Sequence, residues 1–145
     1  MRAHEREELR FPNDTGCFGC SASNPVGLRL TFRRDGEAVV ARHTIAEDFH
    51  GAPGIAHGGI VATLLDEVSC AAIFFLRGHW VVTGELSVRY ARPCPVGRPL
   101  DLVARIAGEA HPKYLVVEAE MRDGDLVLAR STGRFFPQER AEAAP

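Results

Sequence analysis

The sequence has almost no excess charge and no long hydrophobic run. Its 17 Lys and Arg against 19 Asp and Glu leave a net charge of −2 over 145 residues, which excludes a general nucleic-acid binder because such proteins present a strongly basic face. The longest unbroken apolar run, Cys70 to Leu76, is much shorter than the roughly 20 residues of a membrane span. The charged N-terminus has no apolar stretch behind it and does not resemble a signal peptide. We therefore expect a cytoplasmic protein that binds neither nucleic acid nor membrane.

The cysteine pattern is incomplete for a structural metal site. Among the four cysteines, Cys17 and Cys20 have the C-x-x-C spacing of a zinc knuckle or a redox pair. A structural zinc site needs a second ligand pair, and the sequence has neither a further C-x-x-C nor an H-x-x-x-H. Disulfides are rare in a reducing cytoplasm. The spacing therefore predicts a tight loop that binds no metal. The alternative is a zinc-stabilised interaction module.

Internal repeats, low-complexity segments and long linkers are also absent from the sequence. We therefore expect a single domain over residues 1–145, with its core between residues 17 and 136. Residues 1–15 are polar and are expected to be frayed or a short helix, and residues 138–145 to be flexible. Gly, Ser, Asn and Pro are frequent in residues 16–27, which predicts a loop.

Apolar and polar side chains alternate in segments on both sides of one long apolar stretch. Alternation predicts strands at roughly 28–33, 38–43, 82–90, 100–106, 115–121 and 127–135. His57 to Arg77 is apolar almost all round and is followed by Gly78, which predicts a central buried helix that ends there. The sequence therefore predicts an α+β fold, in which an antiparallel sheet of about five or six strands wraps one long helix.

The predicted helix carries a carboxylate near its middle. Burying a charged group is costly unless it is paired or neutralised, so Asp66 is a candidate functional residue. The alternative is a structural carboxylate bonded to Thr63 or to the backbone. Glu67 points about 100° away around the helix and is expected to be an ion-pair partner. The helical neighbours of Asp66 are small enough to leave room for a ligand or a partner element: Gly59, Ala62, Thr63, Ser69 and Cys70.

Two glycines open the same helix. The first N–H groups of a helix have no partner within it, so Gly58 is a candidate donor to an anion or a polarised carbonyl. The alternative is that the Gly-Gly pair only lets the chain turn into the helix. Gly58 and Asp66 lie about 12 Å apart along the axis, too far to contact one carbonyl from the same chain. Two antiparallel helices across a two-fold axis would bring the two groups together, so a homodimer or a dimer of dimers is expected.

Three segments resemble one known family. Residues 53–67, PGIAHGGIVATLLDE, resemble the signature segment of hotdog-fold acyl-CoA thioesterases, in the branch related to the phenylacetate-pathway enzyme. Residues 17–28, CFGCSASNPVGL, and 89–97, RYARPCPVG, resemble two further segments of that branch. The resemblance covers roughly residues 17–136. The chain departs from it at Ser21, where many relatives have Gly, and at Gly51, where some relatives have an Asn that holds the nucleophilic water.

The resemblance implies a hydrolase that cleaves acyl-CoA thioesters without a cofactor. It implies that Asp66 acts as general base or nucleophile and that the Gly58 N–H polarises the carbonyl, in a site shared between subunits. Thr83 matches a position where relatives carry a hydroxyl that assists the water. Strict alternation turns Thr83 away from its apolar neighbours, so this role needs a β-bulge, for which Gly84 is a signal.

The remaining candidates concern the substrate. His50 is a candidate for holding water or substrate, and His57 caps the helix or contributes with Gly59 to substrate binding. The candidates for the phosphates of coenzyme A are Arg89, Arg92, Arg98 and Lys113. The acyl group is not specified, since Phe74, Phe75 and Trp80 line a pocket or fill the core. The rival hypothesis is a non-catalytic acyl-CoA-binding or regulatory hotdog protein.

Overall fold

The long apolar segment forms a single helix, α1, over Gly58–Arg77. At its start the His57 side chain accepts a hydrogen bond from the Gly59 N–H. At its end Gly78 adopts the left-handed conformation, with a φ of 77°, and donates its N–H to the Phe74 carbonyl. Glycine takes this conformation without a Cβ clash, and it is the common way to end a helix. Both ends lie where the sequence predicts them.

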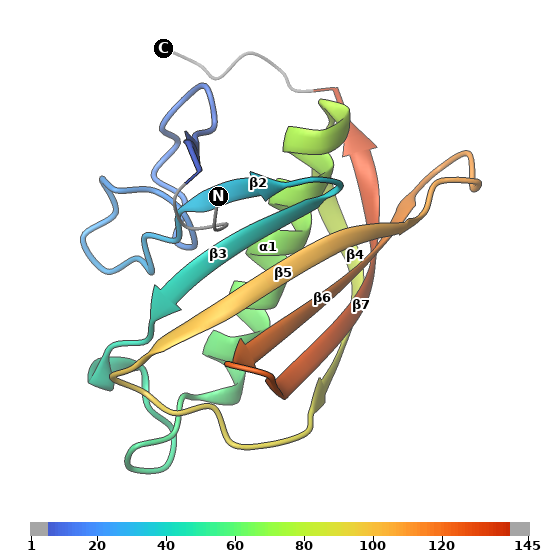
Figure 1. The fold of residues 1–145 in the computed structure, drawn as a ribbon. Coiled ribbons are helices and arrows are strands. Elements are labelled where there is room, and N and C mark those ends of the chain that lie inside the picture. The colour runs from blue at the N-terminus through green and yellow to red at the C-terminus, as the bar shows by residue number, and fades with distance from the viewer. Residues whose placement is uncertain (1–5, 140–145) are drawn as a thin grey trace.

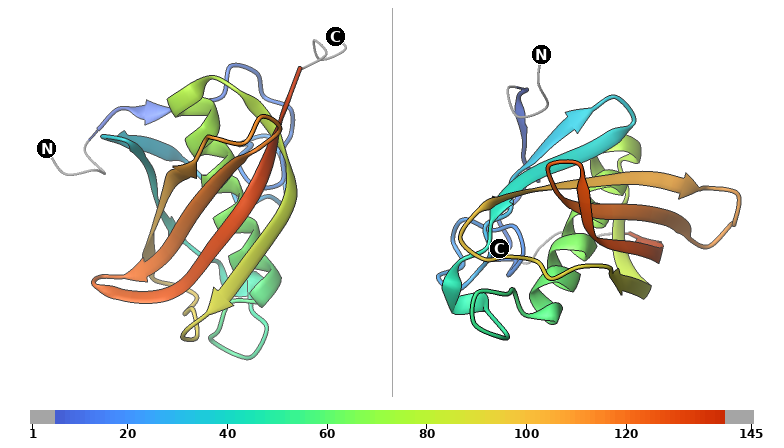
Figure 2. Two further views of the ribbon diagram at one scale, coloured as in Figure 1. Left: turned by 90° about the vertical axis from the view of Figure 1, so that its right-hand side faces the viewer. Right: turned by 60° about the horizontal axis from the view of Figure 1, so that its bottom comes forward.

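The computed structural model describes residues 6–139 and shows α1 lying along one face of a curved antiparallel sheet (Figures 1 and 2). The order across the sheet is β1-β2-β3-β5-β6-β7-β4, so β4 forms one edge. A short 3-10 helix, η2 (Glu47–Phe49), precedes α1. The strands are β1 (Glu8–Leu9), β2 (Phe32–Asp35), β3 (Ala38–Thr44), β4 (Trp80–Tyr90), β5 (Pro99–Gly108), β6 (Leu115–Asp123) and β7 (Leu126–Gln138).

The predicted α+β class is confirmed, but the predicted count of five or six strands is too low. The extra strand, β1, pairs with β2, and next to it the Phe11 ring lies 5.9 Å from the Phe32 ring, centroid to centroid. Residues 1–15 were expected to be frayed or a short helix, and β1 lies within them instead. The sequence did not predict β1 because a two-residue strand is too short to show alternation. The expectations for residues 1–5 and 140–145 lie outside the described residues.

The core lies between α1 and the concave face of the sheet. Alternate residues of β3, β5, β6 and β7 point toward the helix and are buried, among them Phe135 in β7. Burial of this apolar surface is the main stabilising term and holds α1 in a fixed position. Residues on the uncovered side of α1 are therefore held on a rigid element. The large helix side chains that are fully buried are Val61, Leu64, Leu65, Val68 and Ile73.

By length and composition alone, α1 is apolar enough to cross a membrane. The sequence shows no unbroken apolar run of this length because Asp66 and Glu67 interrupt it. A core helix packed on a sheet has the same composition, so packing explains the hydropathy of α1. Only 44% of the apolar stretch is buried within the chain, however. Part of the helix surface thus stays uncovered in a single chain.

Candidate active site

Asp66 lies on the partly uncovered side of α1 and is held by one strong hydrogen bond. The Thr83 hydroxyl donates to Asp66 Oδ1 over 2.6 Å. Burial raises the pKa of the Asp66 carboxyl, and the hydrogen bond from Thr83 opposes this shift. The structural alternative, a bond from Thr63, is wrong, because the Thr63 hydroxyl donates instead to the Gly59 carbonyl over 2.8 Å.

A β-bulge turns Thr83 toward the helix. The pairing of β4 with β7 passes from Thr83–Phe135 to Glu85–Arg134 and leaves Gly84 unpaired. An extra residue in one strand reverses which face the next side chain occupies, so Thr83 can face α1 as Leu86 and Val88 do. A Cβ at Gly84 would collide with the Phe136 ring, so glycine lets that ring pack closely against the bulge. The bulge predicted at Gly84 is confirmed.

The start of α1 offers a free backbone donor. Among residues 6–139, no hydrogen bond uses the Gly58 N–H, although the Gly58 carbonyl accepts from the Tyr90 hydroxyl over 2.6 Å. The His57 imidazole accepts from the Gly59 N–H over 2.9 Å, so the predicted capping role of His57 is confirmed. That bond occupies the Gly59 N–H. Gly58 is therefore the better candidate for an oxyanion donor.

His50 joins this end of the helix and not the Asp66 end. Its Nδ1 lies 2.6 Å from the Glu47 carbonyl oxygen. A hollow of about 400 Å³ is lined by His50, His57, Gly59 and Thr63, among others. Within one chain, the structure thus gathers His50, His57 and Gly59 around the first turn of α1. Asp66 stands about 12 Å farther along the axis.

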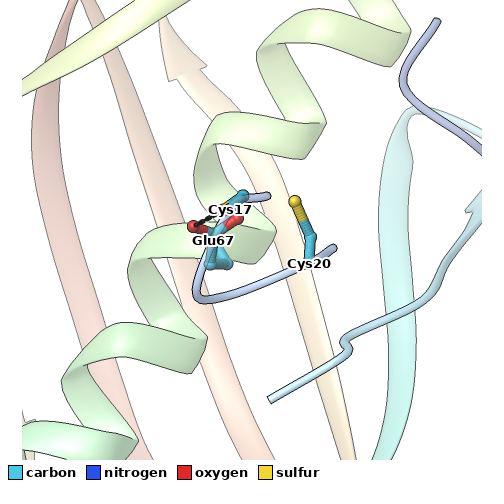
Figure 3. A group of neighbouring side chains, drawn as sticks. All are labelled: Cys17, Cys20 and Glu67. Carbon is cyan, nitrogen blue, oxygen red and sulfur yellow. Dashed lines mark hydrogen bonds between the residues drawn. The ribbon is translucent and has the colours of Figure 1, made fainter. Parts of the chain in front are cut away.

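The structure corrects the prediction made for Glu67. It was expected to be an ion-pair partner, but no ion pair among residues 6–139 involves it. Its Oε1 accepts a hydrogen bond from the Cys17 thiol over 3.3 Å, as Figure 3 shows. Burial raises the pKa of Glu67, and the bond from Cys17 opposes the shift. The N-terminal loop covers this face of α1, which the helical spacing alone does not reveal.

A cavity of about 510 Å³ lies between the N-terminal loop and α1. Phe74 and Trp80 line it, whereas Phe75 packs against Phe11 and Phe32. Cys70 lines the same cavity, and its Sγ lies 3.8 Å from the Thr83 hydroxyl that holds Asp66. Burial raises the pKa of the Cys70 thiol to about 12. The thiol therefore stays protonated at neutral pH, and Cys70 lines the cavity without acting as a nucleophile. The cavity therefore adjoins the candidate catalytic carboxylate.

The cationic candidates separate into two groups. Arg89 and Arg92 flank Tyr90, which reaches Gly58, so they lie toward the start of α1. Lys113 follows β5 at the other end, where Arg77 of α1 bonds Glu109 over 2.6 Å. None of Arg89, Arg92 and Lys113 forms an ion pair with a residue in the described range, whereas Arg98 pairs with Asp123 over 3.1 Å. One chain therefore does not bring Lys113 together with the two arginines.

A further hollow of about 460 Å³ lies on the outer face of the sheet, over β3, β5 and β6. Its lining mixes Arg42, Arg105 and Arg122 with Glu118 and Glu120. Cations and carboxylates in such a mixture largely neutralise one another. None of the candidate residues around Asp66 or Gly58 lines this hollow, so it is not part of the candidate site.

Comparison with known proteins gives one consistent result. The model of the thioesterase superfamily matches residues 53–129. The acyl-coenzyme A thioesterase THEM5 of Mus musculus is 33% identical over 93 residues, covering 63% of this chain and 37% of that protein. The chain thus spans less than two fifths of the length of the curated relatives it matches.

Solved structures share the fold. The conserved protein PA5202 from Pseudomonas aeruginosa is 29% identical with a TM-score of 0.70, covering 82% of this chain and 95% of that one. The E. coli PaaI protein from the phenylacetic acid degradation operon matches with a TM-score of 0.64. The matched region covers 71% of this chain and 78% of the PaaI chain. Its sequence identity is 19%, so that likeness concerns the fold.

Proposed function

Because this chain belongs to the thioesterase superfamily, we propose that it hydrolyses acyl-CoA thioesters with Asp66 as the catalytic carboxylate, acting as general base or nucleophile. The resemblance read from the sequence is thereby confirmed at the level of the superfamily. The observation that carries the proposal is the half-buried Asp66 carboxylate, held at 2.6 Å by the Thr83 hydroxyl on the uncovered side of α1. A carboxylate placed this way can act on a bound substrate, because one oxygen is oriented and the other remains available.

The carbonyl of the thioester is polarised at the start of α1. The Gly58 N–H has no partner among residues 6–139 and lies at the positive end of the helix dipole. Such a donor stabilises the oxyanion that forms when the carbonyl carbon is attacked. His50 and His57 border the same hollow and are placed to contact the substrate there.

Two pathways are compatible with the position of Asp66. As a general base, Asp66 takes a proton from water while the oxygen attacks the carbonyl carbon, and the tetrahedral intermediate then expels the thiolate of coenzyme A. As a nucleophile, Asp66 attacks the carbonyl carbon itself, the C–S bond breaks and the thiolate of coenzyme A leaves, and water later hydrolyses the resulting anhydride. Both pathways need the same oxyanion donor.

The site is shared between two subunits in this proposal. Gly58 and Asp66 stand about 12 Å apart on one helix, so one carbonyl cannot contact both. The uncovered side of α1 carries the exposed Gly58 and Gly59 and the half-buried Ala62, Thr63 and Asp66. Small side chains let a second helix approach closely. A homodimer, alone or within a dimer of dimers, would place Gly58 of each subunit opposite Asp66 of the other.

The cavity beside Asp66 is the best place for the acyl group. Its volume of about 510 Å³ can hold an acyl group, and Phe11, Phe74 and Trp80 would contact an apolar or aromatic chain, although the lining also includes charged residues such as Arg10 and Glu67. Steady-state hydrolysis of a panel from acetyl-CoA through aromatic to long-chain acyl-CoA tests the proposal. Turnover of at least one member is expected. Tight binding of acyl-CoA without turnover by any member would favour the rival, a non-catalytic binding protein.

Thr83 has a predicted positioning role that can be tested separately. Thr83→Val keeps the shape but removes the bond to Asp66, and we expect kcat to fall by about 10–100-fold, as for loss of other orienting partners. Thr83→Ser should restore most of the turnover because it keeps the hydroxyl. Thr132→Val is the matched control, since Thr132 is exposed on the outer face of β7 and makes no bond to Asp66. Equal turnover by Thr83→Val and wild type would exclude this role.

A further inference from the structure

Three metal-binding side chains converge beside the candidate active site and have no part in the proposed hydrolysis. The two Sγ atoms of Cys17 and Cys20 and a carboxylate oxygen of Glu67 all lie within 4.8 Å of one another (Figure 3). In a tetrahedral zinc site, Zn–S and Zn–N/O bonds of about 2.3 and 2.0 Å place the ligand atoms roughly 3.5–3.8 Å apart. The Cys17–Glu67 distance of 3.3 Å is close to that spacing. Small side-chain rotations would therefore suffice to form the site.

The loop that carries the two cysteines is fixed by backbone hydrogen bonds. Leu28 donates to the Phe18 carbonyl over 2.8 Å, and Leu30 donates to the Gly19 carbonyl over 2.9 Å. The Gly19 N–H also donates to the Cys17 sulfur over 3.3 Å. The turn is thus built to present sulfur toward α1.

Gly19 lets this turn reach the helix. A Cβ at Gly19 would overlap the side chain of Glu67, so a larger residue at position 19 would have to move the carboxylate. The turn and Glu67 therefore pack as one unit, although Cys17 and Glu67 are 50 positions apart in the sequence.

No basic side chain balances the charge of Glu67 in the described part of the chain, which leaves the carboxylate available to a cation. Glu67 is partly buried next to Asp66, and no basic side chain of residues 6–139 forms an ion pair with either carboxylate. Buried carboxylates are normally paired, neutralised or bound to a metal. Thiolate ligands select against magnesium and calcium, and a mixed sulfur and carboxylate set suits zinc.

The C-x-x-C spacing alone predicts a loop without metal, but with Glu67 as a third ligand we propose that Cys17, Cys20 and Glu67 bind one Zn²⁺ ion. All three residues line the 510 Å³ cavity, so a water molecule from that cavity completes the four-coordinate site. Binding releases the thiol protons and ties the loop to α1 one residue from Asp66. The ion holds the loop on the helix through three protein ligands, and hydrolysis at Asp66 does not pass through it. The proposal stands independently of the proposed thioesterase activity.

The test measures metal on the full chain, purified with reduced thiols and with no histidine tag. Elemental analysis should give one zinc per chain. After chelation, Co²⁺ should bind with the thiolate-to-metal charge-transfer band and the visible bands of a tetrahedral site. Glu67→Gln and Cys20→Ser should each weaken zinc binding by at least about 10–100-fold. Substituting a residue that only orients a metal ligand already has an effect of that size. Cys94→Ala and Glu118→Gln, which change the same residue types elsewhere in the fold, should bind zinc as wild type does.

Four results would overturn the proposal. The first is a reduced, folded protein that binds no zinc at micromolar concentrations. The second is a Cys17–Cys20 disulfide in the protein as isolated, shown by mass spectrometry. The third is copper or iron in place of zinc. The fourth is unchanged zinc affinity in Glu67→Gln. If a cysteine variant fails to fold, the zinc affinity of Glu67→Gln and the cobalt spectrum of the wild-type protein still test whether these three residues bind the metal.

Discussion

Replacing Asp66 with Asn is expected to lower kcat for acyl-CoA hydrolysis by about two orders of magnitude or more while the protein stays folded. Asparagine keeps the shape and the bond from Thr83 but can neither accept a proton from water nor attack the carbonyl. Folding should not suffer, because the substitution removes a charge that burial disfavours. The measurement follows release of the coenzyme A thiol, with thermal unfolding recorded alongside.

The choice of carboxylate needs its own controls. Glu118→Gln removes an exposed carboxylate on the outer face of the sheet and should leave turnover unchanged. Near-normal turnover in a folded Asp66→Asn variant would refute the assignment. Loss of turnover in Glu67→Gln with Asp66→Asn unaffected would identify the neighbouring acid as the catalytic one.

Replacing Gly58 with Pro is expected to lower kcat by about 100–1000-fold, the usual effect of removing one oxyanion donor. Proline removes the N–H at the first position of a helix, where it is often tolerated. The preceding residue, His57, has φ of −58° and ψ of 135°, which a following proline allows.

Gly58→Ala is the matched variant, because it keeps the N–H. Its Cβ would lie 3.5 Å from the Tyr90 hydroxyl, an ordinary contact. It should retain most of the activity. Equal losses in the alanine and proline variants would mean that space at this position matters and that the N–H does not.

The sequence predicts most of the fold because its periodic elements are long. Alternation places six of the strands, and the uniform apolarity of 57–77 places the helix. Residues 28–31 alternate as a strand would, yet β2 begins at Phe32. Their backbone bonds go to the Cys17–Cys20 turn instead of a strand, and periodicity does not identify the partner of a segment.

The site was partly predictable because two of its residues stand out against a periodic pattern. Asp66 stands out as a carboxylate in an apolar helix, and Gly84 signals the bulge that turns Thr83 toward it. The contact between Cys17 and Glu67 could not be predicted, because it joins a loop to a helix across 50 positions and no periodic pattern connects them. The proposed shared site follows from the distance of about 12 Å between Gly58 and Asp66 along one helix, and a single chain cannot show the subunit that would complete it.

Subunit exchange tests the shared site most directly. Gly58→Pro and Asp66→Asn, each nearly inactive alone, are mixed in equal amounts and allowed to exchange subunits. Each mixed dimer then holds one intact site, with Gly58 from the Asp66→Asn chain and Asp66 from the Gly58→Pro chain. Because half the dimers are mixed and each has one good site of two, roughly a quarter of wild-type activity should return. No recovery after verified exchange between folded subunits would contradict the shared site.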